Sequence, residues 1–334
     1  MIYFIVNESS KSGKAKEIVH DVLMFFKNEG YEYKAFITKY EGHASEMAEK
    51  IVKKEYIDFK NKKKTDAVRI VVLGGDGTIN EVVNGIMAAR DYNAEIDSFA
   101  AKNVYISVYP TGSGNDFIRG ANLNRTKEEL FYAVTDGYED FRATDIGKVT
   151  FSDGNTRYFA ISTGMGMDAL VCRKAEKSML KKLLNIFGMG KLTYIILTVQ
   201  TIFSMDYSFC EIEYETVDNG VITTHEKTLD QMIYIAVLNL FAEGGGVPMA
   251  PNAVSNDGEL DICAAYGLSR GAGFLKLPIL AKGKHEGKKG FFTERVKSIT
   301  IKNDAAMTVH TDGEDMLDRD YMKVECIKGG LNVL

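Results

Sequence analysis

The chain has 334 residues, and 45% of them are hydrophobic, which is enough for one or two domains with their own cores. The formal net charge of -5 argues against a nucleic-acid binder that depends on bulk positive charge. The four cysteines are scattered without CxxC spacing, so we expect a reduced, cytoplasmic protein and no zinc cluster. The longest apolar stretch, Leu192 to Phe203, is shorter than the ~20 residues that span a bilayer, so we expect no transmembrane segment.

The first third of the chain alternates strand and helix patterns. Apolar, β-branched runs predict strands at 2–7, 33–38, 69–73 and 104–109. Helical spacing predicts helices near 14–28, 43–56 and 78–90. Gly30 fits a C-terminal cap of the first helix, and Thr126 with Glu129 fits a capping box for a further short helix. This alternation predicts a parallel sheet covered by helices.

After about Phe141 the pattern changes to short alternating runs separated by Gly, Asn and Asp turns, with helical regions near 169–203 and 271–283. We therefore predict an α/β plus β fold: an N-terminal, Rossmann-like parallel α/β nucleotide domain and a C-terminal antiparallel β-rich domain. We expect the boundaries at 1–142 with 325–334 for the first domain and 143–324 for the second. The expected place for the site is the cleft between the domains.

A glycine-rich stretch, GGDGT, lies directly between the strand that ends at Leu73 and the following helical pattern. Gly74, Gly75 and Gly77 permit a tight turn, and a helix N-terminus presents unpaired N–H groups that suit a phosphate. A carboxylate among phosphate-binding groups needs a cation to relieve the repulsion. Mg²⁺ is commonly held by one or two carboxylates, waters and phosphates, so Asp76 is interpreted as a metal-facing acid.

A second stretch, PTGSGNDF at Pro110 to Phe117, follows the next predicted strand and carries Asp116. Loops after parallel strands gather at the carboxyl edge of a sheet, so Asp76 and Asp116 are expected to meet. One glycine turn alone is often only a tight connection, but two turns that each carry an acid favour a nucleotide site. SKSGK at Ser10 to Lys14 lacks the earlier glycine of a Walker A motif, and no GxGxxG follows a strand.

Several motifs in order give the chain a family resemblance. They are VNESSKSGK, TKYEGHA at 38–44, GGDGTINEVVNG, PTGSGNDFIRG, DIGKV at 145–149, GMGMDA at 164–169, GGGVPMAPNAVSNDGELDI at 244–262 and HTDGE at 310–314. The chain resembles, over nearly its whole length, the diacylglycerol kinase catalytic family of soluble bacterial lipid kinases, which is related in fold to sphingosine kinases and NAD kinases.

The resemblance implies ATP-dependent phosphorylation of a lipid hydroxyl, most often that of diacylglycerol, giving phosphatidic acid. The nucleotide contacts that it implies are Asn7, Lys14, Thr38, Gly75, Asp76, Gly77, Thr78, Ile79, Asn80, Glu81 and Ser113. Lys14 would supply a cation, and Thr78 is expected to head a helix. By the same resemblance, Asp76, Asp116 and Asp145 form an acidic network around a catalytic Mg²⁺, partly through water.

The HTDGE segment is expected, by resemblance, to supply the carboxylate that accepts the hydroxyl proton. Asp312 and Glu314 both remain candidates. If the segment is a strand, the two carboxylates point to the same face. The alternative is a DG turn in a hairpin.

The NDGELD segment resembles the family's separate structural metal loop. The side chain of Asp257 would be joined there by the backbone carbonyls of Val254 and Glu259. Ligation by oxygen alone suits Mg²⁺ or Ca²⁺. Without the resemblance, NDG is simply a good turn sequence.

The expected partner is a lipid substrate at a membrane surface, which the protein would reach by peripheral association. Two basic stretches, Cys172 to Lys191 and Ala281 to Gly290, are predicted to dock on anionic lipid. The alternative is a helix that covers a sheet, with its lysines in water. The five histidines show no ligand spacing and are interpreted as surface or packing residues, and a homodimer is one oligomeric state to test.

Other functions fit parts of the sequence. NAD kinase shares the GGDG loop and fold but has a different second motif, and phosphofructokinase also uses GGDGT but lacks the other acidic and basic signatures. A kinase for another lipid, such as a sphingoid base, fits the same motifs. A regulatory lipid-binding protein that retains the fold is the non-enzyme alternative, and the retained acids argue against it.

Overall fold

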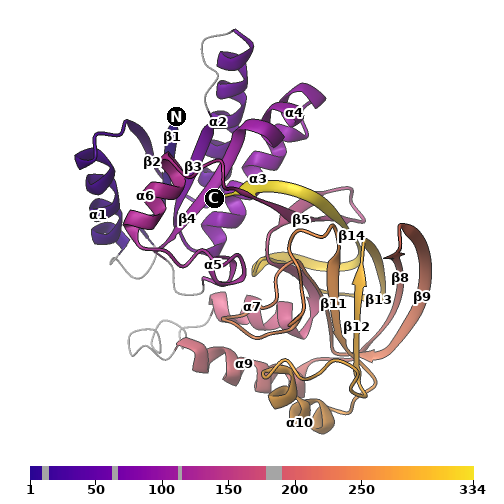
Figure 1. Cartoon of the computed structure of the whole chain (residues 1–334). Helices are drawn as coiled ribbons and strands as arrows, with labels where there is room; N and C mark the ends of the chain where they lie inside the picture. The colour runs from indigo at the N-terminus through magenta and orange to yellow at the C-terminus, as the bar shows by residue number, and fades with distance from the viewer. Residues whose placement is uncertain (10–14, 62–66, 112–114, 178–189) are drawn as a thin grey trace. The chain divides into compact units, whose positions relative to one another are not determined.

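The computed structural model describes residues 1–9, 15–61, 67–111, 115–177 and 190–334. The chain forms two compact units (Figure 1). Unit 1 comprises Met1–Asp145 and Gly329–Leu334, and unit 2 comprises Ile146–Lys328. The boundaries expected from the sequence lie at 142/143 and 324/325, while the units change over at 145/146 and 328/329.

Unit 1 is built on a parallel sheet in the order β2, β1, β3, β4. These strands are Ile2–Val6 (β1), Tyr33–Ile37 (β2), Val68–Gly74 (β3) and Val104–Pro110 (β4). All five residues of β1 are buried. A continuous apolar run of this kind is typical of a parallel strand that is covered on both faces.

Helices cover both faces of this sheet (Figure 1). They are Ala15–Asn28 (α1), His43–Lys60 (α2), Asp76–Arg90 (α3), Ala94–Asn103 (α4), Asp116–Gly120 (α5) and Lys127–Thr135 (α6). Phe4 of β1 packs against Phe26 of α1, while the neighbouring Tyr3 donates a hydrogen bond to Glu55 of α2. The predicted capping box of Thr126 and Glu129 is confirmed at α6, whereas α4 was not predicted.

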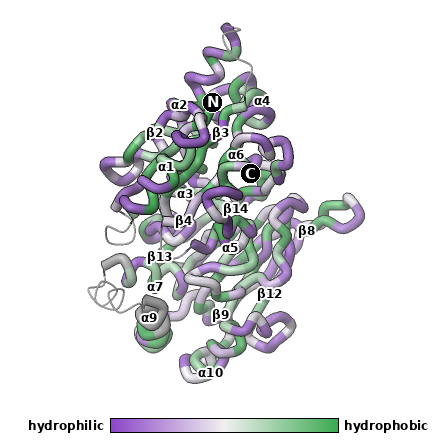
Figure 2. Tube along the Cα trace, turned by 60° about the vertical axis from the view of Figure 1, so that its left-hand side comes forward, coloured by the Kyte–Doolittle hydropathy of each residue, from purple (hydrophilic) through white to green (hydrophobic). Residues whose placement is uncertain are grey.

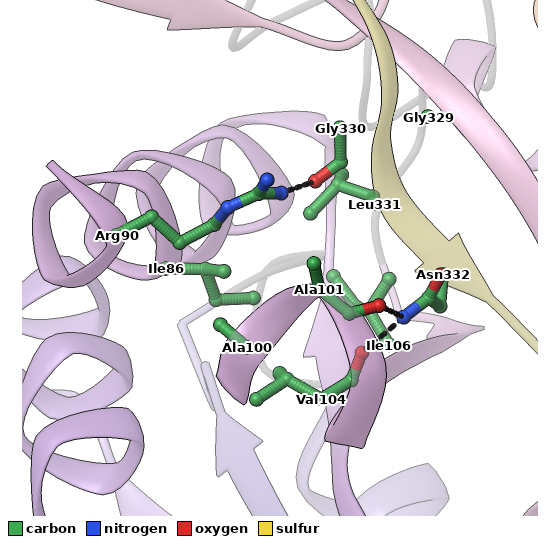
Figure 3. Close-up of a pocket in the computed structure, with 10 residues that line it drawn as sticks. All are labelled: Ile86, Arg90, Ala100, Ala101, Val104, Ile106, Gly329, Gly330, Leu331 and Asn332. Carbon is green, nitrogen blue, oxygen red and sulfur yellow. Dashed lines mark hydrogen bonds between the residues drawn. The ribbon is translucent and has the colours of Figure 1, made fainter. Parts of the chain in front are cut away.

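The C-terminal residues return into unit 1. The last strand, Glu314–Val333 (β14), ends with Asn332 and Val333 paired in parallel to β4. The side-chain amide of Asn332 donates to the carbonyls of Ala101 (2.9 Å) and Val104 (3.0 Å), and Arg90 donates to the carbonyl of Gly330 (Figure 3). These residues line a small hollow that contains none of the predicted site residues, so we interpret it as a packing feature.

Unit 2 is rich in antiparallel strands. They are Arg142–Phe151 (β5, which begins in unit 1), Thr156–Phe159 (β6), Ser162–Gly166 (β7), Ser208–Asp218 (β8), Val221–Met232 (β9), Tyr234–Leu238 (β10), Leu260–Ala265 (β11), Phe291–Val296 (β12), Ser298–Thr311 (β13) and most of β14. The strand β13 pairs in antiparallel fashion with β14, β7 and β8. The predicted fold class, a parallel α/β domain followed by an antiparallel β-rich domain, is confirmed.

Alternation along β10 separates two cores in unit 2. Ile235 and Val237 join a core formed between strands, while Tyr234 and Leu238 join a core beneath helices. The helices on that side are Met167–Lys177 (α7), Gly190–Ser204 (α9) and Arg270–Leu280 (α10). Within the described ranges, no helix is both long and apolar enough to cross a membrane.

The contact between α2 and α3 depends on Gly85. A Cβ added there would lie 2.1 Å from the backbone oxygen of Ser45. We predict that Gly85→Ala lowers the free energy of unfolding by at least about 2 kcal/mol, because the helices must separate, although alanine favours a helix. Chemical unfolding monitored by circular dichroism measures the change.

The matched control is Gly271→Ala, a glycine in α10 whose added Cβ would meet open space. It should leave stability unchanged or raise it by up to about 1 kcal/mol. Equal effects of the two substitutions would show that helix spacing does not depend on Gly85.

Candidate functional site

The glycine-rich loop after β3 leads directly into α3. Gly75 is the N-cap in an extended conformation, and the helix begins at Asp76. Thr78 therefore lies within the first turn, so the expectation that it heads the helix is wrong. A Cβ on Gly74 would lie 2.6 Å from Cβ of Thr78, which explains the glycine at the strand end. The first N–H groups of such a helix have no partner within it, which suits an anion.

The side chain of Asp76 joins this loop to the second one. Its Oδ2 accepts a hydrogen bond from the backbone N–H of Asp116, and its Oδ1 accepts one from Phe117, both at 3.2 Å. The carboxylate of Asp116 is buried and pairs with Arg119 at 2.6 Å. The expected meeting of the two acid-bearing loops is therefore present within unit 1.

Other predicted nucleotide contacts surround the same edge of the sheet. Asn7 follows β1 and donates from Nδ2 to Oγ1 of Thr78 at 3.0 Å, and Thr38 follows β2 and donates its N–H to the carbonyl of Val6. Glu81 accepts a hydrogen bond from the backbone N–H of Ala44 at the start of α2. Its carboxylate therefore holds a neighbouring helix.

Ile79 and Asn80 are fully buried, so a nucleotide contact there would have to use backbone atoms. Gly77, the remaining residue of this loop, lies in the first turn of α3. Lys14 and Ser113 lie outside the described residues.

Asp145, the third acid of the predicted network, is fully buried in unit 1 and accepts a hydrogen bond from the backbone N–H of Gly329 at 2.7 Å. Asp76, Asp116 and Asp145 do not form a group of three whose ligand atoms all lie within 4.8 Å, among the residues that the structure describes. A divalent ion held by all three directly is therefore not preformed. Oxygen donors of this kind suit Mg²⁺ with intervening waters.

The HTDGE segment forms a tight hairpin turn between β13 and β14. Asp312 and Gly313 both have positive φ, 50° and 87°, and Thr311 pairs with Glu314. This is the geometry of a two-residue Asp-Gly turn, so the strand interpretation is wrong and the hairpin alternative is correct. The two carboxylates consequently do not follow one another along one strand face.

The two acids of this turn have different surroundings. The carboxylate of Asp312 accepts three backbone hydrogen bonds, from Ala160 at 2.9 Å, Ile161 at 2.8 Å and Ser162 at 3.0 Å. Asp312 therefore anchors the turn. Glu314 is the first residue of β14 and is partly exposed.

A buried polar cluster that was not predicted lies beside this turn. Nε2 of His310 lies 3.2 Å from Oδ2 of Asp168 and 3.9 Å from Oε2 of Glu243, and the three side chains are at most 10% exposed. Gly164 makes room for them, because a Cβ there would lie 2.0 Å from Oδ2 of Asp168. His310 is therefore not a surface residue but a buried packing residue whose polar atoms are paired.

The charge state of His310 depends on opposing effects. Burial alone would lower the pKa of His310, but the hydrogen bond to Asp168 and the charge of Glu243 outweigh it and raise the pKa to about 9. The backbone N–H of Gly313 points at Nδ1 at 3.2 Å, a bond that only an unprotonated Nδ1 accepts. When His310 is protonated, the hydrogen bond from Gly313 is lost, and the ion pairs with Asp168 and Glu243 become stronger.

The same contact bears on metal binding. A metal-bound histidine usually donates its second ring N–H to an acceptor. In this protein the second nitrogen faces a donor, Gly313, so the single proton of the neutral ring belongs on Nε2, where it is directed to Asp168. The cluster fits a hydrogen-bonded network better than a metal site.

In the predicted metal loop, basic side chains already contact Asp257. Asp257 Oδ2 lies 3.2 Å from Nη1 of Arg295, its Oδ1 accepts the N–H of Glu259, and its backbone carbonyl accepts a hydrogen bond from Lys328. Burial raises the pKa of the nearby Asp261 to about 6, although Arg295 opposes this. A divalent ion held by Val254, Asp257 and Glu259 would compete with Arg295, and this metal stays a prediction.

Comparisons with known proteins cover the chain almost end to end. Residues 1–149 match the family model for the diacylglycerol kinase catalytic domain, and residues 161–334 match that for the YegS C-terminal NAD kinase beta sandwich-like domain. The chain belongs to this family of diacylglycerol kinase-like bacterial lipid kinases. It is therefore a phosphotransferase of the lipid kinase type, and kinase membership implies use of ATP.

Individual relatives agree with this assignment. A diacylglycerol kinase of Staphylococcus haemolyticus is 28% identical over 93% of this chain and 81% of its own. YtlR of Bacillus subtilis, whose name gives a lipid kinase but no particular lipid, is 26% identical over 94% of this chain and 93% of its own. A crystal structure of a diacylglycerol kinase from Bacillus anthracis matches 99% of this chain and 96% of its own, with a TM-score of 0.62 and 21% sequence identity. This match supports the fold.

We predict that His310 makes stability depend on pH. Its pKa is about 9 in the folded chain against an ordinary 6.5, so its contribution is complete below pH 6.5 and fades as pH rises through 9. The stability difference between the parent protein and His310→Gln should shrink by up to roughly 3 kcal/mol over this range. Urea unfolding of both proteins at several pH values measures it, and a difference independent of pH would refute the assignment.

Proposed function

We propose that this lipid kinase transfers the γ-phosphate of ATP to a hydroxyl of diacylglycerol, giving phosphatidic acid. The observation that carries the proposal is the contact of Asp76 with the backbone of residues 116 and 117. It holds the start of α3 to the start of α5, where the two acid-bearing motifs end, in a chain of a kinase family. Relatives named diacylglycerol kinase support the choice of lipid.

In this proposal the triphosphate binds at the first turn of α3. The N–H groups around Gly75 and Gly77 offer hydrogen bonds to phosphate oxygens, and the helix dipole adds a favourable field. Asp76, Asp116 and Asp145 would hold Mg²⁺, in part through water. When bound, Mg²⁺ neutralises phosphate charge during transfer.

Glu314 is the proposed proton acceptor, and Asp312 the residue that positions it. Three backbone N–H groups already occupy the carboxylate of Asp312, so it is a poor base and a good anchor. Glu314, which follows the turn directly and is partly exposed, would take the proton of the lipid hydroxyl as the oxygen attacks phosphorus. The anchored turn fixes the backbone at the start of β14, from which the side chain of Glu314 extends.

Two other classes of substrate should also be tested. The match to a domain described as NAD kinase beta sandwich-like favours testing NAD, and YtlR, named without a stated lipid, favours testing other lipid alcohols such as sphingoid bases. The expected cytoplasmic location, peripheral membrane association and homodimer stay predictions.

The substrate can be identified with γ-labelled ATP and Mg²⁺. The purified chain is offered diacylglycerol, monoacylglycerol, a sphingoid base and NAD in separate reactions, and products are separated by thin-layer chromatography. We expect label in phosphatidic acid. Label in NADP alone, or in a different lipid alone, would overturn the proposed substrate.

We predict that Glu314→Gln lowers kcat by about 100-fold or more, as expected for loss of a general base. Its melting temperature should stay within about 2 °C of the parent value, because the side chain is partly exposed. Initial rates at saturating ATP and a thermal melt measure the two quantities.

The matched variant is Asp312→Asn, two positions earlier. It should lower the melting temperature as well as kcat, because the amide cannot accept all three backbone hydrogen bonds. If Glu314→Gln kept full activity while Asp312→Asn lost it without loss of stability, the two roles would be reversed.

A further inference from the structure

Two neighbouring helices of unit 2 expose large apolar side chains. On α9, Ile196 is 42% exposed and Phe203 is 50% exposed, and on α10, Phe274 is 41% and Leu275 is 74% exposed. The rings of Phe203 and Phe274 lie 6.0 Å apart, so the two sets form one patch. We call these four residues the α9–α10 apolar patch.

The patch is additional to the apolar surface that the two helices already bury. Leu197 and Ile202 of α9, and Leu280 of α10, belong to the core beneath the helices. The helix α9 is therefore apolar on its outer side as well as its inner side, and its described part appears mainly green in Figure 2. Packing among the described residues of unit 2 does not account for the outward-facing side chains, and contiguous exposed apolar surface of this kind marks an interaction site.

The charge next to α10 is mainly basic, although the exposed Asp206 follows α9. From Ser269 to Gly290 the sequence has six basic residues and one acidic residue, Glu286, in a chain with a net charge of -5. Lys282, Lys284, Lys288 and Lys289, which directly follow α10, are all exposed. The helix α9 contains no acidic residue. Exposed aromatic and aliphatic side chains bordered by lysines suit an anionic bilayer surface.

Other segments are less suited to this role. Most of the basic stretch from Cys172 to Lys191 lies outside the described residues. Within its described part, Arg173 is held by Asp315 and Asp318 at 2.6 Å, and Lys174 donates to Thr201. Docking of a second copy through the same patch would bring the lysine clusters of both copies together, which like-charge repulsion disfavours.

We propose that the α9–α10 apolar patch and the lysines that follow α10 form the surface by which the protein docks on an anionic lipid bilayer. The inference rests on the proposed lipid kinase function for its biological sense, but binding can be measured without catalysis. Leu275 and Phe274 insert among the acyl chains, while Lys282, Lys284, Lys288 and Lys289 contact anionic headgroups.

The test is co-sedimentation of the full chain with vesicles of phosphatidylcholine alone or mixed with phosphatidylglycerol, without ATP. The double variant Phe274→Ser/Leu275→Ser should bind the mixed vesicles at least tenfold more weakly than the parent protein. Replacing the four lysines by glutamine should abolish the preference for mixed over neutral vesicles. Both variants change exposed residues, so their melting temperatures should match that of the parent.

The matched control is Val221→Ser/Ile222→Ser, two exposed apolar residues at a hairpin of the same unit, 64% and 48% exposed. Its vesicle binding should stay within twofold of the parent. Parent binding that is absent, or loss of binding equal in control and test variants, would overturn the inference. So would a change from dimer to monomer in the double variant with vesicle binding intact, which would make the patch a contact between copies.

A kinase assay separates this inference from the proposed function. The double variant should phosphorylate a water-soluble, short-chain diacylglycerol within twofold of the parent rate, and lose activity only on vesicle substrate. Vesicle binding that follows the predicted pattern without phosphorylation of any lipid would refute the proposed function alone. Full activity of the double variant on vesicles would refute the docking surface alone.

Discussion

The carboxylate of Asp76 is the constraint on which the nucleotide half of the candidate site depends. It accepts backbone hydrogen bonds from the first residues of α5 while it forms part of the first turn of α3. A single side chain thus links the start of α3 to the start of α5, about forty residues apart in sequence.

Asp312 has the corresponding role in unit 2, because its carboxylate also binds backbone N–H groups. Its three hydrogen bonds to residues 160–162 hold an Asp-Gly turn at the start of β14, and Gly313 of this turn also contacts His310. In both units an acid that resembles a catalytic residue in sequence is bound to backbone N–H groups. These hydrogen bonds determine where the neighbouring segments lie. In the proposal Asp76 also holds Mg²⁺ through water, whereas in unit 2 the proton acceptor is Glu314 and not Asp312.

Much of the fold could be predicted from the sequence because its signals are local. Strand ends with glycine, the alternation of strands and helices, and the capping box at Thr126 each depend on a few adjacent residues. The helix α4 was missed because its ten residues carry a weak apolar pattern, although Asn93 before it is a favourable N-cap residue. The sequence left the turn at Asp312 open between a strand and a hairpin, because the family resemblance gave no geometry while Asp-Gly favours a hairpin.

The buried cluster of His310, Asp168 and Glu243 could not be predicted in the same way. Its members come from β13, α7 and the segment after β10, and only tertiary structure brings them together. The one local signal is the spacing of two between His310 and Asp312 in the HTDGE motif. This spacing indicates only that His310 lies close to the Asp-Gly turn, and it contains no information about Asp168 or Glu243.

The most direct test of the central claim is a crystal structure of the chain with Mg²⁺ and a non-hydrolysable ATP analogue. The account predicts the triphosphate at the first turn of α3, bordered by the loop that contains Asp116, with Asp76 still bound to the backbone of residues 116 and 117. A triphosphate bound away from both glycine-rich loops would contradict it.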